Sequence, residues 1–202
     1  HLGNLKLIVA HLFIGDRLLR MICLSITVFG LMTFYVVWML QPYWEVQGVP
    51  LTAFGVLWAA QSFLFAMATR LCIPLENRFG ARPILVAMAL LPAIGYFGMA
   101  TFGGIIGILL SFTFFVSRGL NQVILTDALN RRVPSAFRST ANSMTSFLFR
   151  AGYIVTGPLI GLLIDAVGMR ATLCVLGFVA LAAFALFMLP MLPEVRSVEQ
   201  RS

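Results

Sequence analysis

Two arginines in the middle of apolar segments are the residues of this sequence whose chemistry most needs an explanation. Arg118 lies in one apolar run, with Asn121 and Gln122 on the same helical face. Arg150 lies in a later run, with Ser146 one turn before it. A guanidinium group at the centre of a bilayer costs roughly 2.5–3.5 kcal/mol even on the scales that give the smallest values. Each arginine therefore predicts a water-filled cavity or a charged partner beside it.

The chemistry that a guanidinium group offers is the binding of an oxyanion. Its fork of N–H donors holds a carboxylate or a phosphate through two parallel hydrogen bonds, and it stays charged when water is removed. The acidic residues of the apolar region lie at loops or helix ends, so they cannot pair with either arginine near the middle of a span. We expect the partner to be an anionic group of a substrate or a carboxylate from elsewhere. The acids concerned are Glu45, Glu76, Asp127 and Asp165.

Three more side chains could shape a pocket for a small-molecule substrate. Gln61 is a polar residue within an apolar run, while Gln41 and Trp38 lie close to the end of the first run. No metal or cofactor is predicted, because the His, Cys and carboxylate residues form no cluster with ligand spacing. The cysteines are scattered over three apolar runs and are predicted to be packing residues. They are Cys23, Cys72 and Cys174.

Enzymes and channels are the classes that the sequence favours least. An intramembrane serine protease needs a GxSxG-like nucleophile and a histidine in another apolar segment. The sequence has no such serine motif, and His1 and His11 both precede the first long apolar run. A channel would be indicated by a repeated arginine sensor or a carbonyl filter sequence, and neither occurs. We predict that the protein is not an enzyme, and we keep both classes as the less favoured alternatives.

The composition of the chain predicts that its solvent is lipid. Of its 202 residues, 60% are hydrophobic and only 10% are charged, which does not fit the polar surface of a soluble domain. One helical crossing of a bilayer needs about 20 apolar residues, and such runs recur along the chain. A transmembrane barrel is disfavoured because its strands alternate apolar and polar residues. We predict an all-α membrane protein with six transmembrane helices at 21–41, 51–71, 83–101, 105–125, 143–164 and 171–192.

Basic residues alternate between the connections of these predicted helices. They gather before the first helix, in the second and fourth connections and after the last helix, whereas Arg170 is the only one in the other connections. Cytoplasmic loops carry such an excess, so both ends of the segment are predicted to be cytoplasmic. The net charge of +7 does not indicate nucleic acid, which needs a basic solvated face. The predicted organisation is a cytoplasmic connector or interfacial helix at 1–20, the six-helix domain at 21–192 and a cytoplasmic tail at 193–202.

The second connection carries a resemblance to a known family. Its sequence IPLENRFGARP is similar to the GxxxDRxGRR loop of the major facilitator superfamily, a family of membrane transporters. Arg78, Gly80 and Arg82 match that pattern, while three other positions depart from it. A degraded copy is typical of the second half of these transporters. Glycine suits a tight turn between two helices because it adopts φ values that other residues avoid.

The predicted fifth helix carries a second resemblance to the same family. Gly157, Pro158 and Gly161 match the GPxxG core of its glycine- and proline-rich helices. Small residues let neighbouring helix backbones approach closely in lipid, and a proline in mid-helix permits a bend. Simple helix packing would require the same residues.

The resemblance implies that the chain is the C-terminal six-helix half of a twelve-span transporter. Such a carrier moves a small-molecule substrate by alternating access, here in a plasma membrane or a bacterial inner membrane. Its partners would be the lipid bilayer and a missing N-terminal six-helix half. The first, second, fourth and fifth helices would face that half, and the third and sixth would face lipid. A stand-alone six-span carrier that dimerises is the main alternative.

Overall fold

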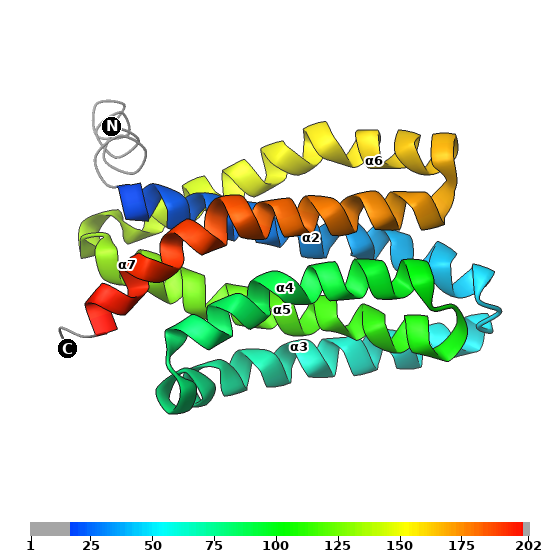
Figure 1. Ribbon diagram of the computed structural model, residues 1–202, viewed down its shortest axis with the longest axis horizontal. Helices are drawn as coiled ribbons and strands as arrows, with labels where there is room; N and C mark the ends of the chain where they lie inside the picture. Colours follow the sequence, from blue (N-terminus) through cyan, green and yellow to red (C-terminus); the bar gives the residue numbers. More distant parts are fainter. Residues whose placement is uncertain (1–16, 200–202) are drawn as a thin grey trace.

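The computed structural model describes residues 17–199, and every regular element in this part of the chain is helical (Figure 1). The prediction of an all-α protein is confirmed. Most of the predicted segment 1–20 lies outside the described residues. The elements are α2 (Arg17–Val46), α3 (Leu51–Phe79), α4 (Ala81–Thr101), α5 (Gly104–Arg132), the 3-10 turn η2 (Ser135–Phe137), α6 (Arg138–Ala183), the π-helical turn η3 (Phe184–Met188) and α7 (Leu189–Glu199).

Five helical segments of the described chain are long and apolar enough to cross a membrane. Four of them are α2 to α5, and the fifth, Ser135–Glu194, has 60 residues. A straight helix of that length would measure about 90 Å, which is about three times the thickness of the hydrocarbon core. A membrane can contain this segment only if its helix axis turns.

The turn lies at Gly168. Its φ of 82° and ψ of 165° are not helical, and a positive φ favours glycine because a Cβ would be strained there. The chain reverses its direction at this residue (Figure 1). We call residues 138–167 the first arm of α6 and residues 169–183 the second arm. The bend falls between the predicted helices at 143–164 and 171–192.

Several helices continue beyond the ends that the sequence predicts. α3 reaches Phe79 and α5 reaches Arg132, whereas the predicted helices end at 71 and 125. α7 likewise continues to Glu199, through part of the predicted tail at 193–202. Hydropathy marks the length of chain that suits hydrocarbon, but a helix can keep its backbone hydrogen bonds through the headgroup layer. That layer brings the full bilayer to about 40–45 Å, which is the length of a helix of about 29 residues.

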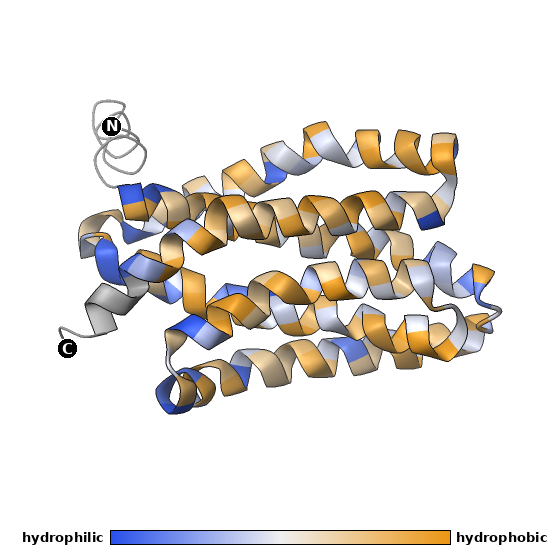
Figure 2. Cartoon of the chain, viewed as in Figure 1, coloured by the Kyte–Doolittle hydropathy of each residue, from blue (hydrophilic) through white to orange (hydrophobic). Residues whose placement is uncertain are grey.

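Hydrophilic residues gather at one end of the helical bundle (Figure 2). The start of α2, the α3–α4 connection and the connection from α5 through η2 to α6 all lie at this end (Figure 1). The α2–α3 and α4–α5 connections and the bend at Gly168 lie at the opposite end. The connections that are rich in basic residues therefore lie at one end of the bundle, and the connections that are poor in them lie at the other end.

α5 lies at the centre of the described helices, in contact with α4, α3 and α2. Side-chain hydrogen bonds to backbone carbonyls hold this centre together: Ser117 Oγ donates to the Met88 oxygen at 2.6 Å and Tyr96 Oη donates to the Met32 oxygen at 2.5 Å. Polar side chains that find acceptors inside a bundle avoid the cost of exposure to lipid. α2 and α4 also pack against α6, whereas α5 and α6 contact each other sparsely. This sparse contact leaves room between α5 and the first arm of α6.

Gly119 determines how closely α5 can approach α3. A Cβ at this position would lie 2.8 Å from both the Phe65 carbonyl oxygen and the Ala68 Cβ. Because backbone atoms cannot move aside cheaply, we expect Gly119→Ala to lower the free energy of unfolding of the purified chain in detergent by about 1–3 kcal/mol. Gly55→Ala in α3 is the matched control, since nothing lies within 4 Å of its Cβ. Equal stability of the two variants would contradict the close approach of the helices.

Candidate functional site

A cavity of about 330 Å³ lies between α2, α5 and the first arm of α6. Arg118, Asn121 and Gln122 line it from α5, and Arg150 lines it from α6. Four of the binding residues predicted from the sequence are thus brought to one place. The space exists because α5 and α6 both pack on α2 but touch each other little. The other lining residues are Ile26, Gly30, Thr126, Asn142, Thr145, Ser146 and Phe149.

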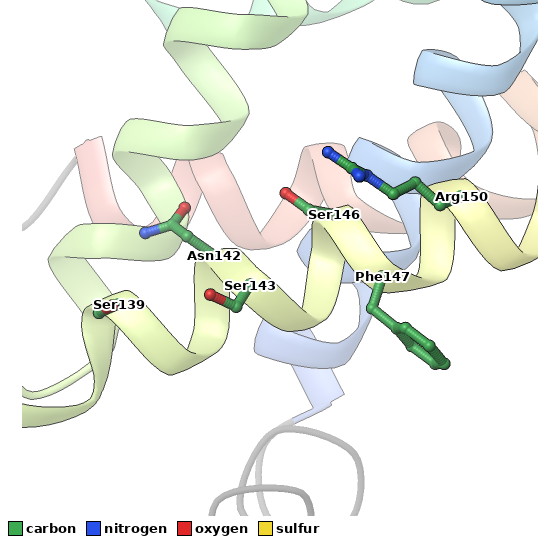
Figure 3. Close-up of a pocket in the computed structure, with 6 residues that line it drawn as sticks. All are labelled: Ser139, Asn142, Ser143, Ser146, Phe147 and Arg150. Carbon is green, nitrogen blue, oxygen red and sulfur yellow. The ribbon is translucent and has the colours of Figure 1, made fainter.

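A second cavity, of about 490 Å³, follows the first arm of α6. It shares Asn142, Ser146 and Arg150 with the first cavity, so the two form one surface, which we call the two-arginine groove. Figure 3 shows the Arg150 side chain reaching back along the helix toward Ser146, while the Phe147 ring points to the other side. The polar side chains follow a helical period of three or four residues. The second cavity is also lined by Ser139, Ser143 and Phe147.

An aromatic ring from α2 fixes the position of Arg118. The Arg118 guanidinium carbon lies 5.8 Å from the centroid of the Phe34 ring, which is within the range of a cation–π interaction. Phe34 is itself held edge-on by Phe149 at 5.2 Å and by Tyr153 at 4.8 Å, both from α6. The face of the ring stabilises the positive charge without using the N–H donors of the guanidinium group. Those donors therefore remain suited to an acceptor in the groove.

Asn121 places a second polar group beside Arg118. Its side chain is only 5% exposed, and its Oδ1 atom finds no hydrogen-bond partner among the described residues. Burying an unsatisfied polar atom costs roughly 1–3 kcal/mol, so the packing around Asn121 is not optimised for stability alone. Gln122, the next residue, is exposed on the open side of the cavity.

The groove carries positive charge that the described residues do not neutralise. Arg118 and Arg150 line it, and no carboxylate is among the described residues of either cavity. Asp127 lies farther along α5 and pairs with Arg131, with 2.6 Å between the Asp127 Oδ2 and Arg131 Nε atoms. Glu45 and Asp165 belong to the opposite end of the bundle, where α2 ends and α6 bends. The charge distribution favours an anion in the groove.

One hydrogen bond joins α5 to α6 along the groove, toward the hydrophilic end of the bundle. Asn142 Nδ2 donates to Asn130 Oδ1 at 2.8 Å and so joins α6 to the end of α5. The same amide also donates to the Arg138 carbonyl oxygen at 2.9 Å. This contact bridges two helices that otherwise meet at few points.

Three residues predicted to line a pocket lie outside the groove. Gln61 is fully buried and its Nε2 donates to Ser111 Oγ at 3.1 Å, so it links α3 to α5. Trp38 is 65% exposed on α2, and Gln41 is exposed one turn later. None of the three lines either cavity of the two-arginine groove. Their polar or aromatic character did not indicate which face of the helix they occupy.

The residues of the loop motif and of the glycine–proline motif do not line the groove. The loop motif forms the connection between α3 and α4. Gly80 has a φ of 84° and its N–H donates to the Glu76 oxygen at 2.7 Å, so it ends α3 with the backbone expected of a glycine turn. The Arg78 guanidinium carbon lies 5.3 Å from the centroid of the Phe79 ring, and Arg82 is exposed.

Among the described residues, no neighbouring helix packs closely on Pro158 or Gly161 of the glycine–proline motif. Pro158 is exposed, nothing lies within 4 Å of a Cβ built at Gly161, and Gly157 meets only Tyr153 from its own helix. The packing role of this motif stays a prediction that requires a neighbour outside the described residues.

Some groove residues were missed from the sequence. Ser139 and Asn142 continue the polar stripe of Arg150 toward the start of α6, so a longer helix in the prediction would have included them. Phe34 gives no comparable signal, because an aromatic residue in an apolar run is ordinarily a packing residue. Its role depends on the way α2 lies against α5 and α6.

Comparison with protein-family models, curated proteins and solved structures finds no match to this chain. The chemistry of the site is therefore defined by its own residues. Two guanidinium groups, a buried amide and several hydroxyl groups line an open groove on an apolar bundle. Such a surface can bind a small polar solute through charge-assisted hydrogen bonds.

Proposed function

We propose that this chain is one half of a secondary active transporter that moves a small solute by alternating access. The observation that carries the proposal is the two-arginine groove, an open polar surface on one side of an apolar helical bundle. Secondary transporters bind their substrates near the bilayer midplane, at the interface between two repeats. Arg118 lies halfway along α5 (Gly104–Arg132), and in a carrier whose α5 spans the bilayer it would lie near that midplane. The groove supplies one side of such a binding site.

In this proposal the first arm of α6 crosses the membrane once, the second arm crosses it again together with η3 and α7, and the chain forms six spans. The bend at Gly168 and the length of the segment support a double crossing. The basic end of the bundle, which holds Gly80 and η2, faces the cytoplasm. The glycine turn at Gly80 and the polar groove support this proposal, in which the chain would be the C-terminal half of a carrier that resembles the major facilitator transporters.

The second half of the transporter would cover the surface that the described helices leave open. Large apolar side chains are exposed on two separate helices of the bundle. Phe63 of α3 is 64% exposed, and Ile154 of the first arm of α6 is 72% exposed. Lipid tails can cover these side chains, but they cannot provide a wall for two guanidinium groups. A partner with its own polar surface can do so. The N-terminal six-helix half fits this role, and a second copy of the chain is the corresponding partner in the dimeric alternative.

Single-cysteine labelling tests the six spans and their orientation. In a cysteine-free background, we expect cysteines at Glu45, Gly103 and Asp165 to react with an impermeant thiol reagent added outside the cells. Cysteines at Asn77 and Ser139 should react only after the membrane is opened, because the basic connections stay in the cytoplasm. Protection of Asp165 from outside with labelling of Gly103 would contradict the double crossing of α6. A reversed pattern at all positions would contradict the orientation.

Reconstitution tests the transport proposal. We expect the purified chain alone to show no uptake above that of empty proteoliposomes for a panel of labelled sugars, amino acids and organic anions. Uptake of at least one solute should appear when the chain is combined with the six-span segment encoded upstream of it. Arg150→Gln should reduce that uptake at least about tenfold, since a hydrogen bond between charged groups commonly contributes about 1.5–3 kcal/mol, while Arg170→Gln should not.

The other outcomes of the reconstitution are equally informative. Robust uptake by the chain alone would favour the dimeric carrier. No uptake in either preparation would contradict transport.

A further inference from the structure

The charges and the hydrogen-bonding groups of the two-arginine groove indicate the class of ligand that it binds. We infer that it binds a small organic or inorganic dianion, with carboxylate or phosphate oxygens placed between Arg118 and Arg150. This inference rests on the proposed function, because it names the substrate class of the same groove. The sequence left open whether the arginines meet a substrate or a carboxylate of another segment, and the geometry of the groove favours the substrate.

The charge of the groove is the first argument. Two guanidinium groups line one continuous surface, and no described residue of that surface carries a negative charge. Two like charges in a medium of reduced dielectric repel each other, and this repulsion is relieved when a bound ligand brings two negative charges. A neutral solute leaves the repulsion in place, and a monoanion relieves only part of it.

The geometry of Arg118 is the second argument. The Phe34 ring, which Phe149 and Tyr153 hold in place, supports one face of the guanidinium group. A preorganised fork of donors binds a carboxylate or phosphate with little loss of side-chain entropy. A cation held in this way at an open cavity is suited to an incoming ligand.

Unused hydrogen-bonding capacity is the third argument. The Asn121 amide is more than nine-tenths buried beside Arg118, and its Oδ1 atom has no partner among the described residues. Ser146 adds a hydroxyl group that is common to both cavities. An oxyanion accepts a hydrogen bond from a hydroxyl group such as that of Ser146, whereas an apolar ligand does not. Asn121 Oδ1 is itself an acceptor, so it would be satisfied by a water molecule that the ion brings.

Arg150 completes the arrangement from the other wall. It is exposed on the first arm of α6, and its side chain lies along the helix over Ser146 (Figure 3). Arg118 is half-buried on α5 beside the Phe34 ring, so a half-buried and an exposed arginine line the same cavity. The dianion would thus bridge two helices that contact each other sparsely.

Charged thiol reagents test the electrostatic part of the inference. In the full chain, purified in a non-ionic detergent and carrying Ser146→Cys in a cysteine-free background, we would compare an anionic and a cationic methanethiosulfonate. We expect the anionic reagent to be favoured about tenfold relative to its preference for a free thiol, and each of Arg118→Gln and Arg150→Gln to lower this preference about threefold. Arg170→Gln, at the opposite end of the bundle, is the matched control and should change nothing. A preference equal to that of the free thiol would overturn the inference.

Ligand protection tests the binding part. Succinate and inorganic phosphate should slow the modification of Ser146→Cys by a neutral thiol reagent at least about threefold, at constant ionic strength. Butyrate should protect less, and glucose and chloride should not protect. Arg150→Lys should keep the preference for the anionic reagent, because the charge is retained, but should lose most of the protection, because the two-pronged hydrogen bonding is lost. This variant also separates a loss of binding from a loss of folding.

The outcomes separate this inference from the proposed function. If the complete transporter carries a neutral solute and neither anion protects, the inference is wrong and the transport proposal stands. If the anions protect but no preparation transports, the binding site stands and the transport proposal is wrong. If adding the upstream segment removes both the charge preference and the protection, the arginines pair with a carboxylate of that segment, and the dianion site is overturned.

Discussion

The cost of placing guanidinium groups among apolar helices is the constraint on which the arrangement of α2, α5 and α6 depends. Arg118 lies halfway along α5, and its side chain is half-buried among the helices. The bundle accommodates it with an aromatic wall from Phe34 on one side and an open cavity on the other. Arg150 lies on the facing wall of the same cavity. A tighter contact between α5 and the first arm of α6 would bury both charges without partners, so the groove is the consequence of these two residues.

The other helices pack into a bundle that supports the walls of this groove. α5 contacts α4, α3 and α2, and serine, tyrosine and glutamine side chains join these helices through hydrogen bonds. The first arm of α6 depends mostly on α2, where Tyr35 and Thr156 share a hydrogen bond of 2.5 Å. Alternating access requires rigid bodies that rock around a fixed site. In the proposed carrier, α2 to α5 would form the rigid part, and the sparse α5–α6 contact at Asn130 and Asn142 would be the place where the groove widens or narrows.

The sequence predicted the class of the fold better than its details. Continuous apolar runs predicted every long helix, because lipid leaves the backbone no other way to satisfy its hydrogen bonds, and helical spacing predicted that Arg118, Asn121 and Gln122 share a face. The predicted helices end too early, because hydropathy identifies the apolar part of a helix but not the polar turns that continue it. Gln61 and Trp38 do not line the groove, and their place as pocket residues stays a prediction, because periodicity gives the face of a residue on its own helix but not which neighbour covers that face. Phe34 could be found only from the packing of three helices.

The most direct test of the central claim is a spin-label scan along the first arm of α6, from residue 139 to residue 157, in the reconstituted chain. The measurement is the collision rate of each nitroxide with a water-soluble nickel reagent and with oxygen, which partitions into lipid. If the groove is open to water, nickel accessibility should peak at residues 139, 143, 146 and 150, with the helical period, while oxygen accessibility peaks on the opposite face near the exposed Val155. High oxygen and low nickel accessibility at every position, including 146 and 150, would show that hydrocarbon fills the space and would contradict a polar groove in the membrane.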